Sequence, residues 1–245
     1  MANRIFGERL KKIGKINRFV HKIFKKQKQY LWRKYFMLGF FITLYTGLSH
    51  AFEADHLLAV SNLVTNRNKP IHAVKDGVFW GIGHTSTIFF VAVLMIILKY
   101  NITARVFSYF EAAVGLMLIL LGIWRLIKLN SDKKHQKEII ADSGAHFHHH
   151  KAALGVGMVH GLAGSGALVV GVLMQMRNWQ EGFWYILIFG IGSIVGMFLA
   201  AGLFSIPFSK SLMKSEKLQI ILILVSSLLC IFYGSHVIWE NLSGM

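Results

Sequence analysis

The chain has 245 residues, of which 54% are hydrophobic, and a formal net charge of +16 at pH 7. A mean hydropathy of +0.51 and several apolar stretches of about 20 residues predict an integral membrane protein rather than a soluble enzyme. The single cysteine, Cys230, excludes an internal disulfide, a Cys-x-x-Cys redox pair and a metal site built from several thiolates.

The N-terminal arm, residues 1–34, carries twelve of the 27 Lys and Arg residues. Its apolar residues recur at helical spacing, which predicts a basic amphipathic helix on an anionic lipid surface. Nucleic-acid binding is the alternative explanation of a basic arm. We set it aside because the arm leads directly into an apolar span. No small-residue cleavage site follows a short apolar core, so the arm lacks the pattern of a cleaved signal peptide.

Hydropathy predicts an all-α, polytopic membrane bundle. Its six expected spans are residues 35–64, 76–98, 107–129, 152–176, 182–206 and 217–241. The connections between them are short except for 130–151, which is polar. Residues 35–129 and 152–245 therefore form two groups of three spans on either side of this loop.

The first expected span contains four ionisable side chains within seven residues: His50, Glu53, Asp55 and His56. A charge near the bilayer centre costs about 2.5–3.5 kcal/mol on insertion scales, so such groups are retained where they have a function. Imidazole and carboxylate groups together are good ligands for a divalent transition metal. A structural polar network between helices is the alternative, although it needs fewer ionisable groups. The cluster predicts an intramembrane metal site.

The shape of the first span decides which carboxylate joins the histidines. At about 100° per residue, a straight helix places His50, Glu53 and His56 on one face and points Asp55 at a neighbouring helix. A break near Gly47 or His50 would instead bring Asp55 to the histidines. The span of about 30 residues is longer than the bilayer core requires, so a tilted or interrupted helix is compatible with it. The sequence leaves both geometries open.

Two further histidines lie among apolar residues, His84 in the second span and His160 in the fourth. Either alone would be read as a hydrogen-bonded histidine between helices, but beside the cluster both are candidate ligands. The loop 130–151 has the composition of a metal-collecting tract, with a solvated linker as the alternative. Its histidines are His135, His146, His148, His149 and His150.

The two groups of three spans resemble each other. Repeats with three spans each must have opposite orientations, which predicts the 3+3 inverted repeat of many secondary transporters. Chance similarity among apolar helices is the alternative. The aligned segments are Gly47-Leu48-Ser49-His50 with Gly157-Met158-Val159-His160, Phe79-Trp80-Gly81-Ile82-Gly83-His84 with Ile188-Phe189-Gly190-Ile191-Gly192-Ser193, and Gly122-Ile123-Trp124 with Gly234-Ser235-His236.

No nucleotide-binding motif is found. The small-residue run 161–166 lacks the Gly-Lys-Ser/Thr ending of a phosphate-binding loop and lies in an apolar segment. Transport would therefore have to be driven by a gradient or by a partner protein.

The segment His50-Ala51-Phe52-Glu53-Ala54-Asp55-His56-Leu57 resembles the signature of the nickel/cobalt transporter family, H-A-x-D-A-D-H-I. His50, Asp55 and His56 match the family's metal-recognition residues, and Glu53 replaces its first Asp. The segment 79–87 is similar to the second motif of the family, with His84 as its histidine. The segment 160–168 resembles the UreH-type, urease-accessory branch. The resemblance covers residues 35 to about 240.

This resemblance implies a permease for Ni²⁺ or Co²⁺ in the cytoplasmic membrane, with no prosthetic group. The implied metal residues are His50, Glu53, Asp55, His56, His84 and His160. Typical family members have eight spans, whereas six are expected here.

Ligands of this kind do not distinguish Ni²⁺, Co²⁺ and Zn²⁺. A metal exporter and an accessory protein that delivers metal to nickel-enzyme maturation proteins remain alternatives. A membrane thiol-disulfide carrier would need two cysteines.

Overall fold

The computed structural model describes residues 22, 25–27, 29–30, 37–64, 70–98, 103–134, 145–162, 179–208 and 215–243. The chain divides into two compact units, Met1–Ile42 and Thr43–Met245. All predicted metal residues belong to the second unit. Most of the predicted basic arm lies outside the described residues, and the few that are described there are helical and exposed.

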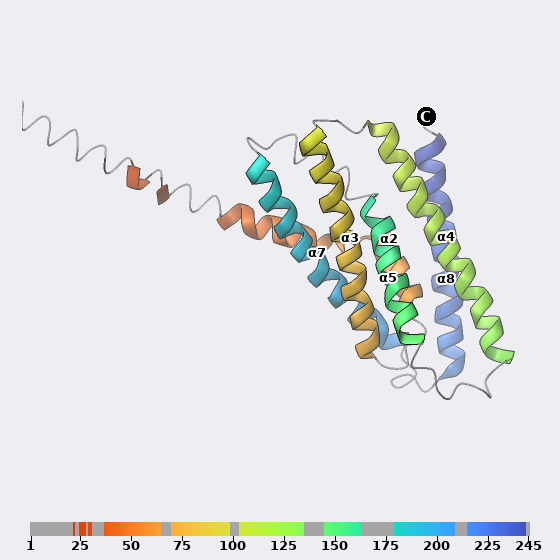
Figure 1. Cartoon of the computed structure of the whole chain (residues 1–245). Coiled ribbons are helices and arrows are strands. Elements are labelled where there is room, and N and C mark those ends of the chain that lie inside the picture. The colour runs from red at the N-terminus through yellow and green to blue at the C-terminus, as the bar shows by residue number, and fades with distance from the viewer. Residues whose placement is uncertain are drawn as a thin grey trace, which may run out of the picture. The chain divides into compact units, whose positions relative to one another are not determined.

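Every described element is a helix (Figure 1). Residues 43–50 are helical, and α2 to α8 follow them. By length and composition, α3, α4, α7 and α8 can each cross a membrane. The chain is thus a multi-pass helical membrane protein. The elements are α2 (Ala54–Val64), α3 (Pro70–Leu98), α4 (Ala104–Lys134), α5 (Ala145–Leu162), α7 (Trp179–Phe208) and α8 (Glu216–Ser243).

The spans expected over 76–98, 107–129, 182–206 and 217–241 are confirmed as helices, each with a few more residues than hydropathy gave. The first expected span is interrupted after His50. The fourth, expected over 152–176, is described as far as Leu162 in α5, and residues 163–178 lie outside the described part.

The polar loop expected over 130–151 is shorter in the structure. Helix α4 continues to Lys134 and α5 begins at Ala145. His146, His148, His149 and His150 are therefore helical residues at the start of α5. His135 lies outside the described residues.

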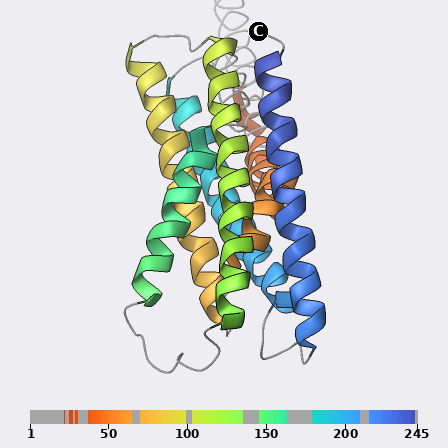
Figure 2. The same cartoon turned by 90° about the vertical axis from the view of Figure 1, so that its right-hand side faces the viewer.

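Helix α3 packs against both α5 and α7, and α4 lies along α8 (Figures 1 and 2). The short α2 contacts α4, α7 and α8 as well as α3. Its buried residues include His56, Val60 and Asn62. Asn62 accepts a hydrogen bond from Ser227 in α8 at 3.0 Å. These contacts place the residues that follow the interruption inside the helix bundle.

Two helix crossings bring backbones into direct contact at glycines. Gly157 in α5 lies against the carbonyl group of Trp80 in α3, and Gly47 lies against the carbonyl group of Phe189 in α7. A methyl group on either glycine would overlap with the carbonyl oxygen that it faces. Small residues allow this close approach between membrane helices, and the sequence had aligned Gly47 with Gly157 and Trp80 with Phe189.

The α4–α8 crossing brings backbones together in the same way. Gly115 and Gly234 each face the backbone carbonyl of the other, and Gly122 faces the carbonyl of Ser227. Small residues therefore allow a close approach at this crossing as well.

The Gly157 contact gives a prediction with a control in the same helix. Gly157→Ala should destabilise the protein by about 1–3 kcal/mol, the usual cost of overpacking, because backbone atoms must move. Gly155→Ala should cause no loss, since nothing lies within 4 Å of the added methyl group. Thermal unfolding in detergent measures both. Equal melting temperatures for the two variants would contradict the close crossing.

Candidate metal centre

The helix over residues 43–50 ends in a tight turn at His50. Phe52 N–H donates to the carbonyl oxygen of Ser49 at 2.9 Å, and Glu53 N–H donates to that of His50 at 3.1 Å. These three-residue spacings are tighter than those of an α-helix. The next helix starts when Leu57 N–H donates to the Glu53 carbonyl at 2.9 Å. Of the two geometries that the sequence left open, the structure has the interrupted one.

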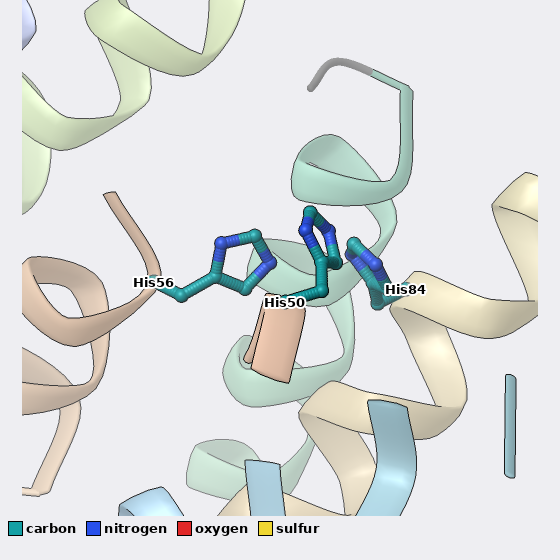
Figure 3. Close-up of side chains that lie close together, drawn as sticks. All are labelled: His50, His56 and His84. Carbon is teal, nitrogen blue, oxygen red and sulfur yellow. The ribbon is translucent and has the colours of Figure 1, made fainter. Parts of the chain in front are cut away.

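Three histidines meet where the chain turns. His50, His56 and His84 are all buried, and one ring nitrogen from each lies within 4.8 Å of the others. The ring centroid of His50 is 4.6 Å from that of His56 and 5.3 Å from that of His84. The ring centroids of His56 and His84 are 5.2 Å apart. The close-up shows the three imidazoles converging (Figure 3).

A second group overlaps the first and includes Asp55. Ligand atoms of Asp55, His56 and His160 also lie within 4.8 Å of one another. Asp55 Oδ1 is 3.0 Å from His56 Nδ1, and its Oδ2 is 3.7 Å from His160 Nε2. The rings of His56 and His160 have centroids 4.5 Å apart. His56 is thus common to both groups, which draw on the turn, α2, α3 and α5.

Glu53 lies at the edge of the cluster. Its Oε1 is 2.9 Å from His50 Nδ1, but its side chain is 51% exposed. It belongs to neither group of converging ligand atoms. The interruption of the helix explains this, because it turns Asp55 inward and leaves Glu53 outside. The structure therefore brings five of the six predicted residues together and places the sixth beside them.

Most ring nitrogens in the cluster have no hydrogen-bond partner within the described parts of the chain. These are both nitrogens of His50, His84 and His160, and Nε2 of His56. The Glu53 carboxylate lies close to Nδ1 of His50, but the two atoms do not form a hydrogen bond. An unsatisfied buried polar group costs about 1–3 kcal/mol. A bound cation would satisfy one nitrogen of each ring that ligates it, and a set of imidazoles with a carboxylate suits Ni²⁺, Co²⁺ or Zn²⁺.

Two buried aromatic residues form walls of the cluster, and the sequence did not single them out. The Trp80 ring lies 5.5 Å from the His56 ring and 5.7 Å from the His160 ring. The Phe189 ring lies 5.6 Å from the His50 ring. The signal was present in the sequence, since the aligned segments of the two halves place Trp80 and Phe189 at the same position.

Comparison with known proteins shows the family to which the chain belongs. Residues 63–236 match the family model described as cytochrome C biogenesis protein transmembrane region. The chain is 32% identical over 214 residues to urease accessory protein UreH of Bacillus sp. (strain TB-90), an alignment that covers 83% of this chain and 90% of the relative. No solved structure matches the chain.

A shorter match includes a transporter. The chain is 37% identical over 68 residues to the nickel transporter NicT of Mycobacterium tuberculosis (strain ATCC 25618 / H37Rv), covering 26% of this chain and 18% of that protein. The long match to UreH carries the assignment, and the motif around His50 and His56 agrees with it. The chain belongs to the UreH-type branch of the nickel/cobalt transporter family and shares its membrane region with the cytochrome C biogenesis proteins.

Proposed function

We propose that the protein is a secondary transporter for a divalent transition-metal cation, Ni²⁺ or Co²⁺, in the cytoplasmic membrane. The observation that carries the proposal is the convergence of His50, His56 and His84 in a buried cluster whose ring nitrogens lack other partners. The names of the relatives, a urease accessory protein and a nickel transporter, support nickel as the cargo. The ion is the substrate, bound transiently, and no prosthetic group is required.

The two overlapping groups suggest how the ion moves. In the first position it is held by His50, His56 and His84, and in the second by Asp55, His56 and His160. His56 belongs to both sets, so the ion can pass from one set to the other without returning to water. Such an exchange avoids the large desolvation cost of a free ion inside the protein.

The charge of Asp55 favours a cationic cargo. Neutral imidazoles add no charge, while the Asp55 carboxylate, whose side chain is 17% exposed, supplies one negative charge inside the cluster. This partial neutralisation reduces the cost of holding a cation within the apolar bundle, where an unpaired charge is expensive.

We also propose that the chain has six spans arranged as a 3+3 inverted repeat. Matching contacts in the two halves support it: Gly157 on Trp80 corresponds to Gly47 on Phe189. The α4–α8 contacts fit the alignment of Gly122 with Gly234, because Gly122 on Ser227 then corresponds to Gly234 on Gly115. Rocking of one half against the other would open the site to each side in turn. An interrupted helix beside the site is a common feature of such transporters.

Delivery of metal as an accessory protein is the second candidate, and it is favoured by the name of the relative UreH. Such a protein would bind the ion at the same residues, hand it to nickel-enzyme maturation proteins and give no flux by itself. A thiol-disulfide carrier is not proposed, because Cys230 is the single cysteine of the chain and packs in α8 with its Sγ 3.9 Å from the Leu58 carbonyl oxygen.

Reconstitution separates these candidates. Purified protein in liposomes that contain a metal-sensitive dye should give protein-dependent entry of Ni²⁺ or Co²⁺, and no faster entry of Mg²⁺, which prefers oxygen ligands. Tight Ni²⁺ binding without flux would favour the accessory protein. Absence of both would remove the proposed function.

Single substitutions test the cluster itself. His50→Ala, Asp55→Ala and His56→Ala should each abolish uptake of Ni²⁺ while leaving the amount of protein in the membrane unchanged, because each removes a converging ligand. His236→Ala is the matched control, since His236 is an exposed histidine near a carboxylate, 3.7 Å from Glu240. Near-normal uptake in any two of the three cluster variants would refute the site.

The interrupted helix predicts unequal roles for the two carboxylates. Asp55→Asn should weaken Ni²⁺ binding by about 10–100-fold, because Asp55 contacts both His56 and His160. Glu53→Gln should change the affinity by about threefold or less, since solvent screens its exposed side chain. Equilibrium dialysis of both purified variants measures the difference. Equal losses would indicate that the first span is a continuous helix in the working protein.

A further inference from the structure

A second buried carboxylate–histidine pair lies outside the central cluster. Asp76 in α3 is 1% exposed, although it falls within the apolar span Ile71–Met95. Its Oδ1 is 2.8 Å from Nδ1 of His150 in α5. The His150 ring also stacks on Phe79, with centroids 4.9 Å apart and planes at 22°. The histidine is therefore fixed on two sides, by a charge and by an aromatic ring.

This pair repeats the arrangement found in the central cluster. Asp55 lies on Nδ1 of His56, Glu53 lies close to Nδ1 of His50, and Asp76 lies on Nδ1 of His150. A histidine that binds a metal usually presents its other ring nitrogen to a carboxylate, which fixes its tautomer and strengthens it as a ligand. With Nδ1 occupied, Nε2 of His150 is the nitrogen available for a metal.

The position of the pair connects it to the central cluster. At about 1.5 Å per residue, Asp76 precedes His84 along α3 by about 12 Å, and His150 precedes His160 along α5 by about 15 Å. The same two helices touch at both levels, because Gly161 lies against the carbonyl of His84. Trp80 lies between the two levels in α3 and contacts the rings of His56 and His160.

We infer that His150, held by Asp76, is a second binding station for the same divalent transition metal, from which the ion exchanges with the central cluster along the α3–α5 crossing. This inference rests on the proposed transport function. In this proposal His150 is a defined metal ligand, which distinguishes it from His146, His148 and His149 at the start of α5.

The competing explanation is that the pair only fastens the first turns of α5 to α3. Both explanations predict some loss of stability when the pair is broken. Only a metal station predicts that the number of bound ions falls while the fold persists. Asp76→Asn separates the two, because asparagine keeps the size and the accepting oxygen of aspartate but removes its charge.

The first measurement is Ni²⁺ binding by equilibrium dialysis of the purified full-length protein. His56→Ala removes the residue common to both central groups, so the ions that this variant still binds report on other sites. In this background, adding His150→Gln or Asp76→Asn should weaken the remaining Ni²⁺ binding by about 10–100-fold. Adding His236→Gln, at the exposed pair in α8, should not change it.

A result in which Asp76→Asn leaves the remaining binding unchanged would overturn the station. It would assign that binding to the other histidines of α5. A fall in melting temperature for both variants with unchanged Ni²⁺ binding would establish a structural fastening instead, and would also overturn the inference.

Flux in liposomes is the second measurement. With the central residues intact, His150→Gln and Asp76→Asn should raise the Ni²⁺ concentration for half-maximal flux about tenfold or more, and the His236→Gln control should match the unsubstituted protein. If the unsubstituted protein neither binds nor moves Ni²⁺, the proposed function itself fails. If it does both and the Asp76→Asn protein is indistinguishable from it, only the second station fails.

Discussion

The tight turn after His50 determines where the ionisable groups of the first span lie. On a continuous helix, Asp55 would point about 140° away from His50, toward a neighbouring helix. The two i→i+3 hydrogen bonds at Phe52 and Glu53 rotate the chain, so that Asp55 reaches His56 and His160. Such a break is tolerated at membrane depth only where it is enclosed by protein. Here the turn's own hydrogen bonds satisfy part of its backbone, and Ala51 and His56 on either side of it are buried, whereas Phe52, Glu53 and Ala54 are exposed.

Glycine contacts then bring the remaining histidines to the turn. With Gly157 against Trp80 and Gly47 against Phe189, the backbones of the crossing helices touch directly. The close approach positions the histidines. A side chain at either glycine would push the helices apart and move His160 or His50 away from the other histidines. One aromatic residue lies at each of these crossings. Trp80 meets Gly157 and packs beside the His160 ring, and Phe189 meets Gly47 and packs beside the His50 ring.

The sequence predicted the features that hydropathy and chemistry alone decide. Four long apolar helices follow from composition, and the histidine–carboxylate set follows from the cost of placing such groups among apolar residues. The interruption after His50 could not be decided, because a long span tolerates both a straight and a broken helix. Asp76 was missed because a carboxylate near the end of a span is ordinary, and its burial depends on α5.

The presence of His56 in both ligand groups has a kinetic consequence. In the proposed transport, an ion that moves between the two groups must exchange the ligands that they do not share. Its rate therefore depends on how quickly the metal releases a nitrogen or oxygen donor. Metals that bind the site equally well would thus cross at different speeds. Selection among Ni²⁺, Co²⁺ and Zn²⁺ in such a centre is governed by the lability of the cation as well as by its equilibrium affinity.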